Sequence, residues 1–339
     1  MAAPVRFGLL GLGMMGRHHA RVLRDLEGVE LAAVADPQGD PSGRAPGYEV
    51  LTSVQDLIEA RIDACVVAIP TAFHSEVALQ LAEAGVHALV EKPLAPTSIE
   101  SGRIVDAFES AGLIGCVGHI ERYNPSLVEL RKRLENGELG EMYQVSTRRQ
   151  GPFPNRIADV GVVMDLATHD IDLTAWVTER PYRSVAAHAQ HKSGRQHEDL
   201  VAVVAQLEGG TVANHLVNWL SPMKERVTVV TGERGCFVAN TLDADLTFHE
   251  NGLVPTQWDH VSSFRGVVEG NSTRYAIPKP EPLRVELEQF RDAVLGKDAD
   301  VISMRDGLSA VQVAEACIAS ARSGSTVQIE ARVQEGAAR

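Results

Sequence analysis

A glycine-rich turn near the amino terminus of this 339-residue chain has the spacing of a dinucleotide-binding motif. Its first glycine permits a tight turn, its second lets the backbone approach a pyrophosphate, and its third allows close packing of helix on sheet. It follows an apolar run and opens a helical segment, whose first N–H groups can bind an anion. We therefore predict a dinucleotide cofactor. The motif consists of Gly11, Leu12, Gly13, Met14, Met15 and Gly16.

An acidic residue at the end of the second apolar run bears on which dinucleotide binds. Asp36 lies 20 residues after Gly16. Its carboxylate can accept hydrogen bonds from both ribose hydroxyls and would repel a 2′-phosphate. The next basic residue is Arg44, so the pattern favours NAD over NADP. The alternative is that Asp36, which precedes Pro37, is simply a turn residue.

Three further residues have types suited to oxidising an alcohol. Glu91, Lys92 and Pro93 follow the fourth apolar run, at the edge of a parallel sheet where ligands of open α/β folds bind. Asp165 and His169 are one turn apart if their segment is helical. Loss of a hydride from a secondary alcohol also releases a proton, which His169 could accept. Asp165 could bind the substrate or orient the base, and Lys92 could stabilise an alkoxide or relay the proton.

Each of these residues also has a structural interpretation. Lys92 could pair with Glu91 or a surface acid, Asp165 could cap a helix, and His169 could be a core histidine. Asp165 and His169 could also ligate a metal. No third ligand is indicated and the chemistry needs none, so we expect no metal.

Five apolar runs alternate with helical segments over the first 120 residues. Apolar strands separated by helices are typical of a parallel sheet covered on both faces. We therefore expect residues 1–122 to form a Rossmann domain. Ser53 and Thr97 are expected to cap two of its helices. The runs are Val5–Leu10, Leu31–Ala35, Ala64–Ile69, Val86–Val90 and Ile114–Gly118.

The pattern changes after about residue 123, where short strands dominate. We expect residues 123–339 to form an α/β domain with a mostly antiparallel sheet, including a hairpin at Gly209-Gly210. Its late helices, Pro282–Leu295 and Asp306–Ser323, could pack back on the first domain. The predicted strands include Met142–Arg149, Leu200–Leu207, Thr211–Trp219, Arg226–Thr231, Cys236–Asn240 and Leu246–His249.

Composition limits the range of partners. Lys and Arg number 32 and Asp and Glu 45, and the net charge of −13 argues against nucleic acid. The four cysteines have no zinc-site spacing, which is typical of a reduced, cytoplasmic protein. The apolar run at 7–16 is too short to span a membrane. We expect a cytoplasmic protein with a small-molecule substrate and no membrane or nucleic-acid partner.

Four motifs together resemble the glucose–fructose oxidoreductase / inositol dehydrogenase (Gfo/Idh/MocA) family, over nearly the whole chain. The resemblance implies a Rossmann domain followed by an α/β domain whose open, mostly antiparallel sheet commonly forms the interface of a homo-oligomer. It implies that Lys92, Asp165 and His169 surround the reacting hydroxyl. The motifs are the glycine-rich turn, Ala68-Ile69-Pro70-Thr71-Ala72-Phe73-His74, Glu91-Lys92-Pro93 and Asp165-x-x-x-His169. By the same resemblance, the additional cofactor contacts are Pro70, Thr71, His74, Glu91 and Lys92.

Two stretches, 118–125 and 151–165, look most like members that oxidise position 3 of UDP-N-acetylglucosamine and related sugars. The family's usual Gly-Gly before the Asp helix is replaced by Val160-Gly161-Val162, which bears on the substrate rather than on the chemistry. Arg122 and Arg156 are candidates to bind a diphosphate, or are ordinary surface charges. The predicted substrate contacts are Lys92, Arg122, Tyr123, Asn124, Arg148, Arg156, Asp165 and His169.

Two other functions fit the same sequence. An inositol, aminocyclitol or free-sugar dehydrogenase would use the same reacting residues without a diphosphate site. A non-catalytic NAD-binding regulator could share the fold, since fold does not imply function. Retention of Lys92, Asp165 and His169 argues against the regulator. We also expect a dimer or tetramer formed through the second-domain sheet.

Overall fold

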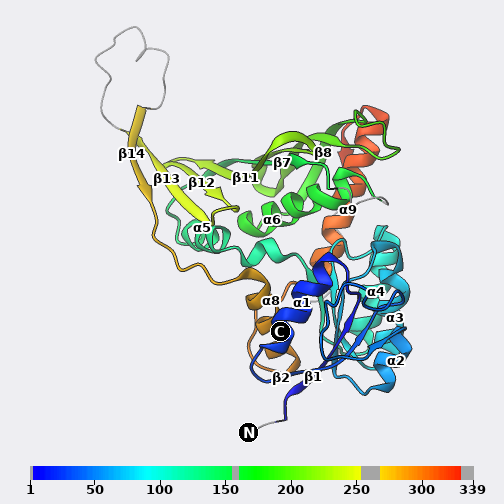
Figure 1. The fold of residues 1–339 in the computed structure, drawn as a ribbon. Coiled ribbons are helices and arrows are strands. Elements are labelled where there is room, and N and C mark those ends of the chain that lie inside the picture. Colours follow the sequence, from blue (N-terminus) through cyan, green and yellow to red (C-terminus); the bar gives the residue numbers. More distant parts are fainter. Residues whose placement is uncertain (1–2, 155–159, 253–267, 330–339) are drawn as a thin grey trace. The chain divides into compact units, whose positions relative to one another are not determined.

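A computed structural model describes residues 3–154, 160–252 and 268–329 of the chain (Figure 1). These residues form two compact units, and each unit contains part of the predicted site. The glycine-rich turn and Lys92 belong to the first unit, and Asp165 and His169 belong to the second. The first unit comprises residues 3–123 and 280–312; the second comprises 124–154, 160–252, 268–279 and 313–329.

The first unit contains a six-stranded parallel sheet, sheet A, with the order β3-β2-β1-β4-β5-β6. The order reverses between β1 and β4, and open α/β sheets bind ligands at such a point. The five predicted strands are present. Strand β3 has only two residues and escaped prediction because so short a segment shows no pattern. The strands are β1 (Val5–Leu10), β2 (Val29–Ala35), β3 (Val50–Leu51), β4 (Ala64–Val67), β5 (His87–Glu91) and β6 (Gly115–Gly118).

Helices cover both faces of sheet A, as continuous apolar strands require. Helices α2 (Val54–Glu59), α3 (His74–Glu83) and α4 (Ser98–Ser110) bury their apolar side chains against one face (Figure 1). Helices α1 (Met14–Arg24) and α8 (Pro282–Val294) do so against the other. The late helix α8 therefore contributes to the core of the first unit.

Two predicted helix caps in the first unit are confirmed. Ser53 and Asp56 form a capping box at the start of α2, because each side chain accepts a hydrogen bond from the other's backbone N–H. The Thr97 side chain accepts from the Glu100 N–H at the start of α4. These local signals fix where the helices begin. The unit also contains the 3-10 helices η1 (Thr71–Phe73) and η2 (Ile120–Tyr123).

The described part of the second unit contains a nine-stranded sheet, sheet B, with the order β14-β13-β12-β11-β7-β10-β9-β8-β15. All neighbours are antiparallel except β7 and β10. The predicted hairpin joins β9 to β10 through η4 (Glu208–Gly210). The predicted fold class is thus confirmed. The strands are β7 (Met142–Pro152), β8 (Tyr182–Gln190), β9 (Leu200–Leu207), β10 (Val212–Asn218), β11 (Leu220–Gly232), β12 (Gly235–Asn240), β13 (Asp245–Gly252), β14 (Val268–Arg274) and β15 (Val327–Gln328).

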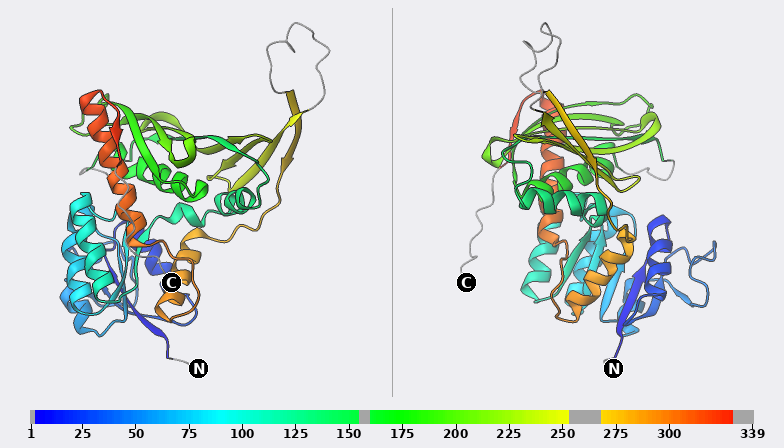
Figure 2. Two further views of the ribbon diagram at one scale, coloured as in Figure 1. Left: turned by 180° about the vertical axis from the view of Figure 1, so that it is seen from behind. Right: turned by 90° about the vertical axis from the view of Figure 1, so that its left-hand side faces the viewer.

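The two faces of sheet B differ. Helices α5 (Pro125–Glu135) and α6 (Thr168–Thr178) lie against one face (Figure 2). The other, which we call the open face, carries exposed apolar side chains, and Val204 is 57% exposed. Helix α9 (Met304–Ser323) is divided between the units after Gln312. The open face includes Gln144, Arg148, Val204, Val212 and Asn214.

Within the described ranges, we find no helix with both the length and the apolar character needed to cross a membrane.

Candidate active site

The glycine-rich turn has the geometry that a dinucleotide requires. Gly11 has a φ of +95°, and a Cβ on it would lie 2.4 Å from the Ala68 carbonyl oxygen. A Cβ on Gly16 would lie 1.9 Å from the Gly11 carbonyl oxygen, so this glycine is needed for packing. A Cβ on Gly13 would meet nothing within 4 Å, and no described side chain caps α1 at this residue. The turn therefore has open space and N–H groups for a pyrophosphate.

Asp36 is oriented toward the same turn. Its Oδ2 accepts a hydrogen bond of 2.7 Å from the Leu12 N–H, and its Oδ1 accepts one of 2.8 Å from the Gln38 N–H. Each carboxylate oxygen keeps a lone pair for a ribose hydroxyl. Arg44 donates to the Leu12 carbonyl, so its guanidinium also lies at the turn. The sequence did not indicate that contact.

A buried hydrogen bond connects α1 to the residue before Lys92. Glu91 ends β5, and its Oε1 lies 2.9 Å from Nε2 of His19, which is fully buried in α1. The Lys92 N–H donates to the other Glu91 oxygen. Burial alone would raise the pKa of Glu91, but His19 and the Lys92 charge hold it below its usual value. Sequence reasoning missed His19, although it lies three residues after Gly16. We call the turn, Asp36, Glu91 and Lys92 the cofactor edge.

His74 connects the segment that follows β4 with the turn that follows β5. Its Nδ1 lies 2.9 Å from the Pro93 carbonyl oxygen, and its Nε2 lies 3.0 Å from that of Ile69. The side chain is buried, which lowers its pKa, so His74 is not a surface residue at the start of α3. His74 ties the segment with Pro70 and Thr71 to the turn after Lys92. Direct contact with a cofactor stays a prediction for His74, Pro70 and Thr71.

Asp165 lies in a π-helical turn rather than in the α-helix that its spacing predicted. The turn, η3 (Val163–Ala167), precedes α6, in which His169 lies. Asp165 is 5% exposed and His169 is half-buried. Such turns are frequent at functional sites. Sequence periodicity could not reveal it, because one wider turn does not alter the apolar pattern.

Glu198, in the loop between β8 and β9, holds the start of that turn. Its carbonyl accepts from the Val162 N–H at 2.9 Å, and its Oε1 accepts from the Val163 N–H at 3.1 Å. A Cβ on Gly161 would lie 1.9 Å from the same carboxylate oxygen, so a larger residue there would displace the Glu198 side chain. A carboxylate here stabilises a helix start. We call residues 160–169 with Glu198 the substrate turn.

Sequence reasoning missed Arg195, as it missed His19 and Glu198. Its guanidinium lies 4.3 Å from the ring centre of Phe153 and donates to the Val160 carbonyl at 3.3 Å. Trp219 contacts Phe153 edge-on and lies near the same guanidinium. The loop before Asp165 is therefore bordered by a cation seated on aromatic rings. Arg195 and Val160 are 35 residues apart in the sequence, which hides this proximity.

Comparison with known families matches both parts of the chain. Residues 5–119 match "Oxidoreductase family, NAD-binding Rossmann fold", and residues 127–238 match "GFO/IDH/MocA C-terminal domain". The chain belongs to the Gfo/Idh/MocA oxidoreductase family. The predicted family, enzyme class and NAD cofactor are thereby confirmed. The open turn at Gly13 and the carboxylate of Asp36 fit that cofactor.

Two curated relatives cover most of this Gfo/Idh/MocA enzyme. Inositol 2-dehydrogenase 2 of Saccharopolyspora erythraea is 28% identical over 340 residues, covering 96% of both chains. UDP-N-acetylglucosamine 3-dehydrogenase of Acidithiobacillus ferrooxidans is 30% identical over 299 residues, covering 86% of this chain and 88% of its own. A solved structure of the latter protein has a TM-score of 0.81 at 24% identity, covering 95% and 99% of the two chains, which supports the fold.

Two predicted substrate residues of the enzyme have partners within the first unit. Arg122 pairs with Asp306 at 3.1 Å, and its side chain is only 12% exposed. Burial would raise the pKa of Asp306, but the Arg122 charge keeps it below its usual value. The Tyr123 hydroxyl donates to the Asp300 carbonyl at 2.9 Å. Their polar groups thus stabilise the unit, and a role in substrate binding stays a prediction.

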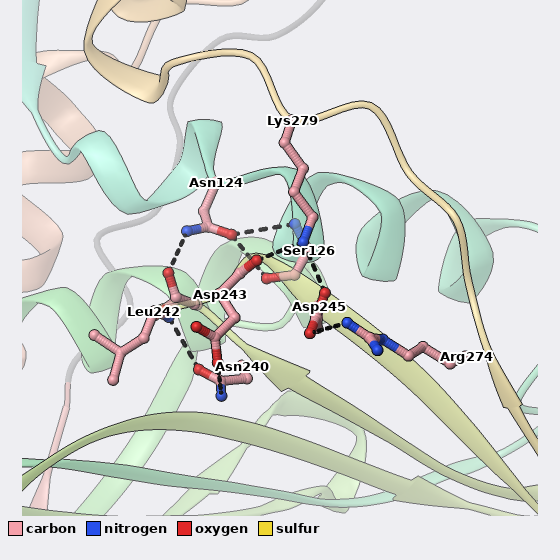
Figure 3. Close-up of polar contacts among 9 residues, drawn as sticks. Asn124, Ser126, Asn240, Leu242, Asp243, Asp245, Arg274 and Lys279 are labelled. Atoms are coloured by element: carbon pink, nitrogen blue, oxygen red, sulfur yellow. Dashed lines mark hydrogen bonds and ion pairs between the residues drawn. The ribbon is translucent and has the colours of Figure 1, made fainter.

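Asn124 caps a helix. Its Oδ1 accepts from the N–H and hydroxyl of Ser126 at the start of α5, and its Nδ2 donates to the Thr241 carbonyl at 2.9 Å (Figure 3). Nearby, Lys279 donates to the Asp243 carbonyl. Both ends of the carboxamide are engaged with the protein. Substrate contact by Asn124 therefore stays a prediction.

The structure does not bring Arg148 together with the substrate turn. Arg148 lies on the open face of sheet B and pairs with Glu225 at 2.9 Å. The next residue, Arg149, points to the other face and pairs with Asp170 of α6 at 3.0 Å. Because α6 carries His169, Arg148 lies on the wrong side of the sheet to join it within one chain. Arg156 lies outside the described residues.

Proposed function

We propose that this enzyme oxidises a secondary ring hydroxyl, with position 3 of a nucleotide-linked amino sugar such as UDP-N-acetylglucosamine as the reacting carbon. One observation carries the proposal. The relatives that match most of the chain are named as dehydrogenases of a cyclitol and of a sugar nucleotide, and the latter is 30% identical. Neither name supports a non-catalytic regulator.

The reacting residues are those of the cofactor edge and the substrate turn. We propose that Lys92, Asp165 and His169 act on the same hydroxyl. His169 accepts the hydroxyl proton, because imidazole exchanges protons near neutral pH. Asp165, which is nearly buried, orients the hydroxyl or the imidazole. Lys92 stabilises the developing negative charge on the oxygen with its ammonium.

Bound NAD supplies the hydride acceptor. The chain's own contribution to binding lies at the cofactor edge. Main-chain N–H groups of the turn after Gly13 would bind the pyrophosphate, and the Asp36 carboxylate would accept hydrogen bonds from the ribose hydroxyls. The His19–Glu91 hydrogen bond fixes the position of the Lys92 backbone relative to α1.

A diphosphate or another anionic group of the substrate needs cationic partners. Arg122 is already paired with Asp306, and Arg148 faces away from α6. We therefore add Arg195 to Arg156 as a cation that could serve, because Arg195 borders the loop before Asp165. Arginine suits phosphate because its planar fork can donate two parallel hydrogen bonds.

A cyclitol or a free sugar is the second candidate substrate. It is favoured by the inositol 2-dehydrogenase relative, which covers 96% of this chain. Such a substrate has no phosphate, so it would not depend on Arg195 or Arg156. The reacting residues would be the same.

The test is NADH formation from NAD with purified enzyme and a panel of UDP-sugars, free amino sugars, inositols and aminocyclitols. We expect turnover with UDP-N-acetylhexosamines, and a sharp rise of KM in Arg195→Ala or Arg156→Ala. Lys192→Ala, in the same loop as Arg195, is the matched control. Turnover confined to cyclitols or free sugars would overturn the nucleotide-sugar proposal and keep the dehydrogenase.

We also propose that the enzyme is a cytoplasmic homo-oligomer assembled through the open face of sheet B. Val204 and Val212 expose 57% and 43% of their surface there. Apolar side chains in a regular sheet favour burial against a second copy. Light scattering in solution tests the assembly.

A further inference from the structure

A buried acid in the first unit takes no part in the proposed chemistry. Glu286 lies on the inner side of α8, between the core residues Leu283, Leu287 and Phe290. It is only 2% exposed. Neither of its carboxyl oxygens has a hydrogen-bond partner among the residues that the structure describes. Buried carboxyl groups are normally paired, so Glu286 needs an explanation.

The groups that interact with Glu286 lie at the end of β5, which belongs to the cofactor edge, and in β6 and η2. Helix α8 packs against α1 and η2. Glu286 interacts electrostatically with Glu91 at the end of β5, with Cys116 in β6 and with Tyr123 in η2. Glu91 in turn binds His19 of α1 and the Lys92 N–H. Arg122, the residue before Tyr123, is paired with Asp306.

Glu91 and Glu286 are both buried and interact electrostatically, and they favour different protonation states. Glu91 has His19 and Lys92 as cationic or donor partners, which favour its ionised form. For Glu286, burial and then the charge of Glu91 raise the pKa well above the usual range. An ionised Glu286 would be a second negative charge without a partner in a dry core. Two titratable groups whose environments move their pKa values apart in this way have different roles.

We propose that Glu286 keeps its proton in the folded enzyme and is a positioning residue for Lys92, acting through Glu91. As a neutral acid it leaves Glu91 as the single negative charge beside His19. The Glu91 carboxylate accepts a hydrogen bond from the Lys92 N–H and so fixes the backbone turn that carries the Lys92 side chain. Ionisation of Glu286 would add a like charge behind Glu91, strain the His19–Glu91 pair and displace Lys92. The inference rests on the proposed role of Lys92.

The raised pKa of Glu286 makes the free energy of unfolding depend on pH. Such a carboxyl has a higher pKa in the folded chain than in the unfolded chain. It contributes its full stabilisation only at pH values below its pKa in the unfolded chain. That contribution is lost as the pH rises toward the pKa of the group in the folded chain. Glu286→Gln is neutral at every pH and has nearly the same shape. The stability of the variant relative to the native chain should therefore increase with pH.

The first experiment compares urea unfolding of the full chain and Glu286→Gln across pH. Above the usual glutamate pKa of 4.5, the ratio of their unfolding constants should change by up to about tenfold per pH unit. Glu288→Gln, a half-buried acid on the same helix, should show no such trend. A ratio that stays flat with pH, or moves the other way, would show that Glu286 is ionised in the folded state and would overturn the proposal.

The second experiment reads the positioning role in turnover. We expect Glu286→Gln to keep the native kcat near neutral pH and to hold it to higher pH than the native enzyme, with KM and NADH affinity unchanged. Glu286→Ala should lower kcat without lowering NADH affinity. A merely space-filling role predicts superimposable pH profiles for the native and Gln enzymes, which would overturn the proposal. If no substrate turns over, the proposed function fails. The unfolding comparison still shows whether Glu286 is protonated in the folded chain.

Discussion

The cofactor edge and the substrate turn are held in place by different means. At the cofactor edge, glycine positions are dictated by backbone atoms: a Cβ on Gly16 would meet the Gly11 carbonyl oxygen at 1.9 Å. At the substrate turn, the neighbour of Gly161 is a side chain that can move, since a Cβ on Gly161 would meet the Glu198 carboxylate. A backbone constraint recurs wherever the same strand, turn and helix occur. A side-chain constraint depends on a residue from a distant loop and can change with the substrate.

The largest effect expected from a single substitution is at Lys92. Lys92→Ala should reduce turnover by about 10²–10⁴-fold, because the alkoxide loses its cation. NADH affinity should stay nearly native, since the glycine turn and Asp36 remain. Stopped-flow turnover and a fluorescence titration of NADH measure the two quantities. Lys297→Ala, an exposed lysine of the same unit, is the control. Turnover within tenfold of native would remove Lys92 from the mechanism.

Two glycine substitutions separate cofactor contact from packing at the cofactor edge. Gly13→Ala adds a Cβ that meets no protein atom, so NADH affinity should fall about tenfold with unfolding unchanged. Gly16→Ala should lower both affinity and stability, the latter by about 1–3 kcal/mol, because its Cβ meets backbone. Gly102→Ala in α4 has open space and serves as the control. Equal effects of Gly13→Ala and Gly102→Ala on NADH affinity would contradict this assignment.

A smaller effect is expected at the substrate turn. Glu198→Gln should lower stability by about 1 kcal/mol, because a neutral amide supports the start of the π-helical turn less well than a carboxylate does. kcat/KM for the substrate should fall while NADH affinity is unchanged. Urea unfolding, turnover and NADH titration report these separately. Glu250→Gln, an exposed acid in β13, is the matched change. A loss of NADH affinity would mean that the two regions are not independent.

The smallest effect on chemistry is expected from the open face of sheet B. Val204→Glu should shift the enzyme toward monomer, because it places a charge in the proposed interface. NADH affinity should remain native, since Val204 lies in the second unit. Light scattering measures the mass, and Glu225→Gln controls for a polar change near the same face. An oligomer unaffected by Val204→Glu would remove this face as the interface.

The same contrast accounts for what the sequence could and could not predict. The apolar strands, the glycine spacing and Asp36 are local signals with one structural solution, so the Rossmann fold and the NAD site were predictable. His19, His74 and Glu198 act through contacts 72, 19 and 35 residues away. Those contacts exist only after folding, and the π-helical turn at Asp165 has no pattern of its own.

Two of the predicted substrate arginines have surroundings in the fold that their sequence positions do not indicate. Arg148 looked equivalent to Arg149 in the sequence, but strand alternation places them on opposite faces of sheet B. Arg122 looked available, but Asp306 lies far along the chain and neutralises it. Charge alone therefore did not identify an anion site. The position of Arg195 over Phe153 is visible only in the fold.

The central claim, that hydride leaves position 3 of a nucleotide-linked amino sugar, can be tested by one isotope experiment. UDP-N-acetylglucosamine deuterated at carbon 3 is incubated with the enzyme and NAD, and the NADH formed is analysed by mass spectrometry. We predict that the NADH carries one deuterium and that its formation is slower than with unlabelled substrate. NADH without deuterium would place the oxidised carbon elsewhere, and no NADH from this substrate would contradict the nucleotide-sugar assignment.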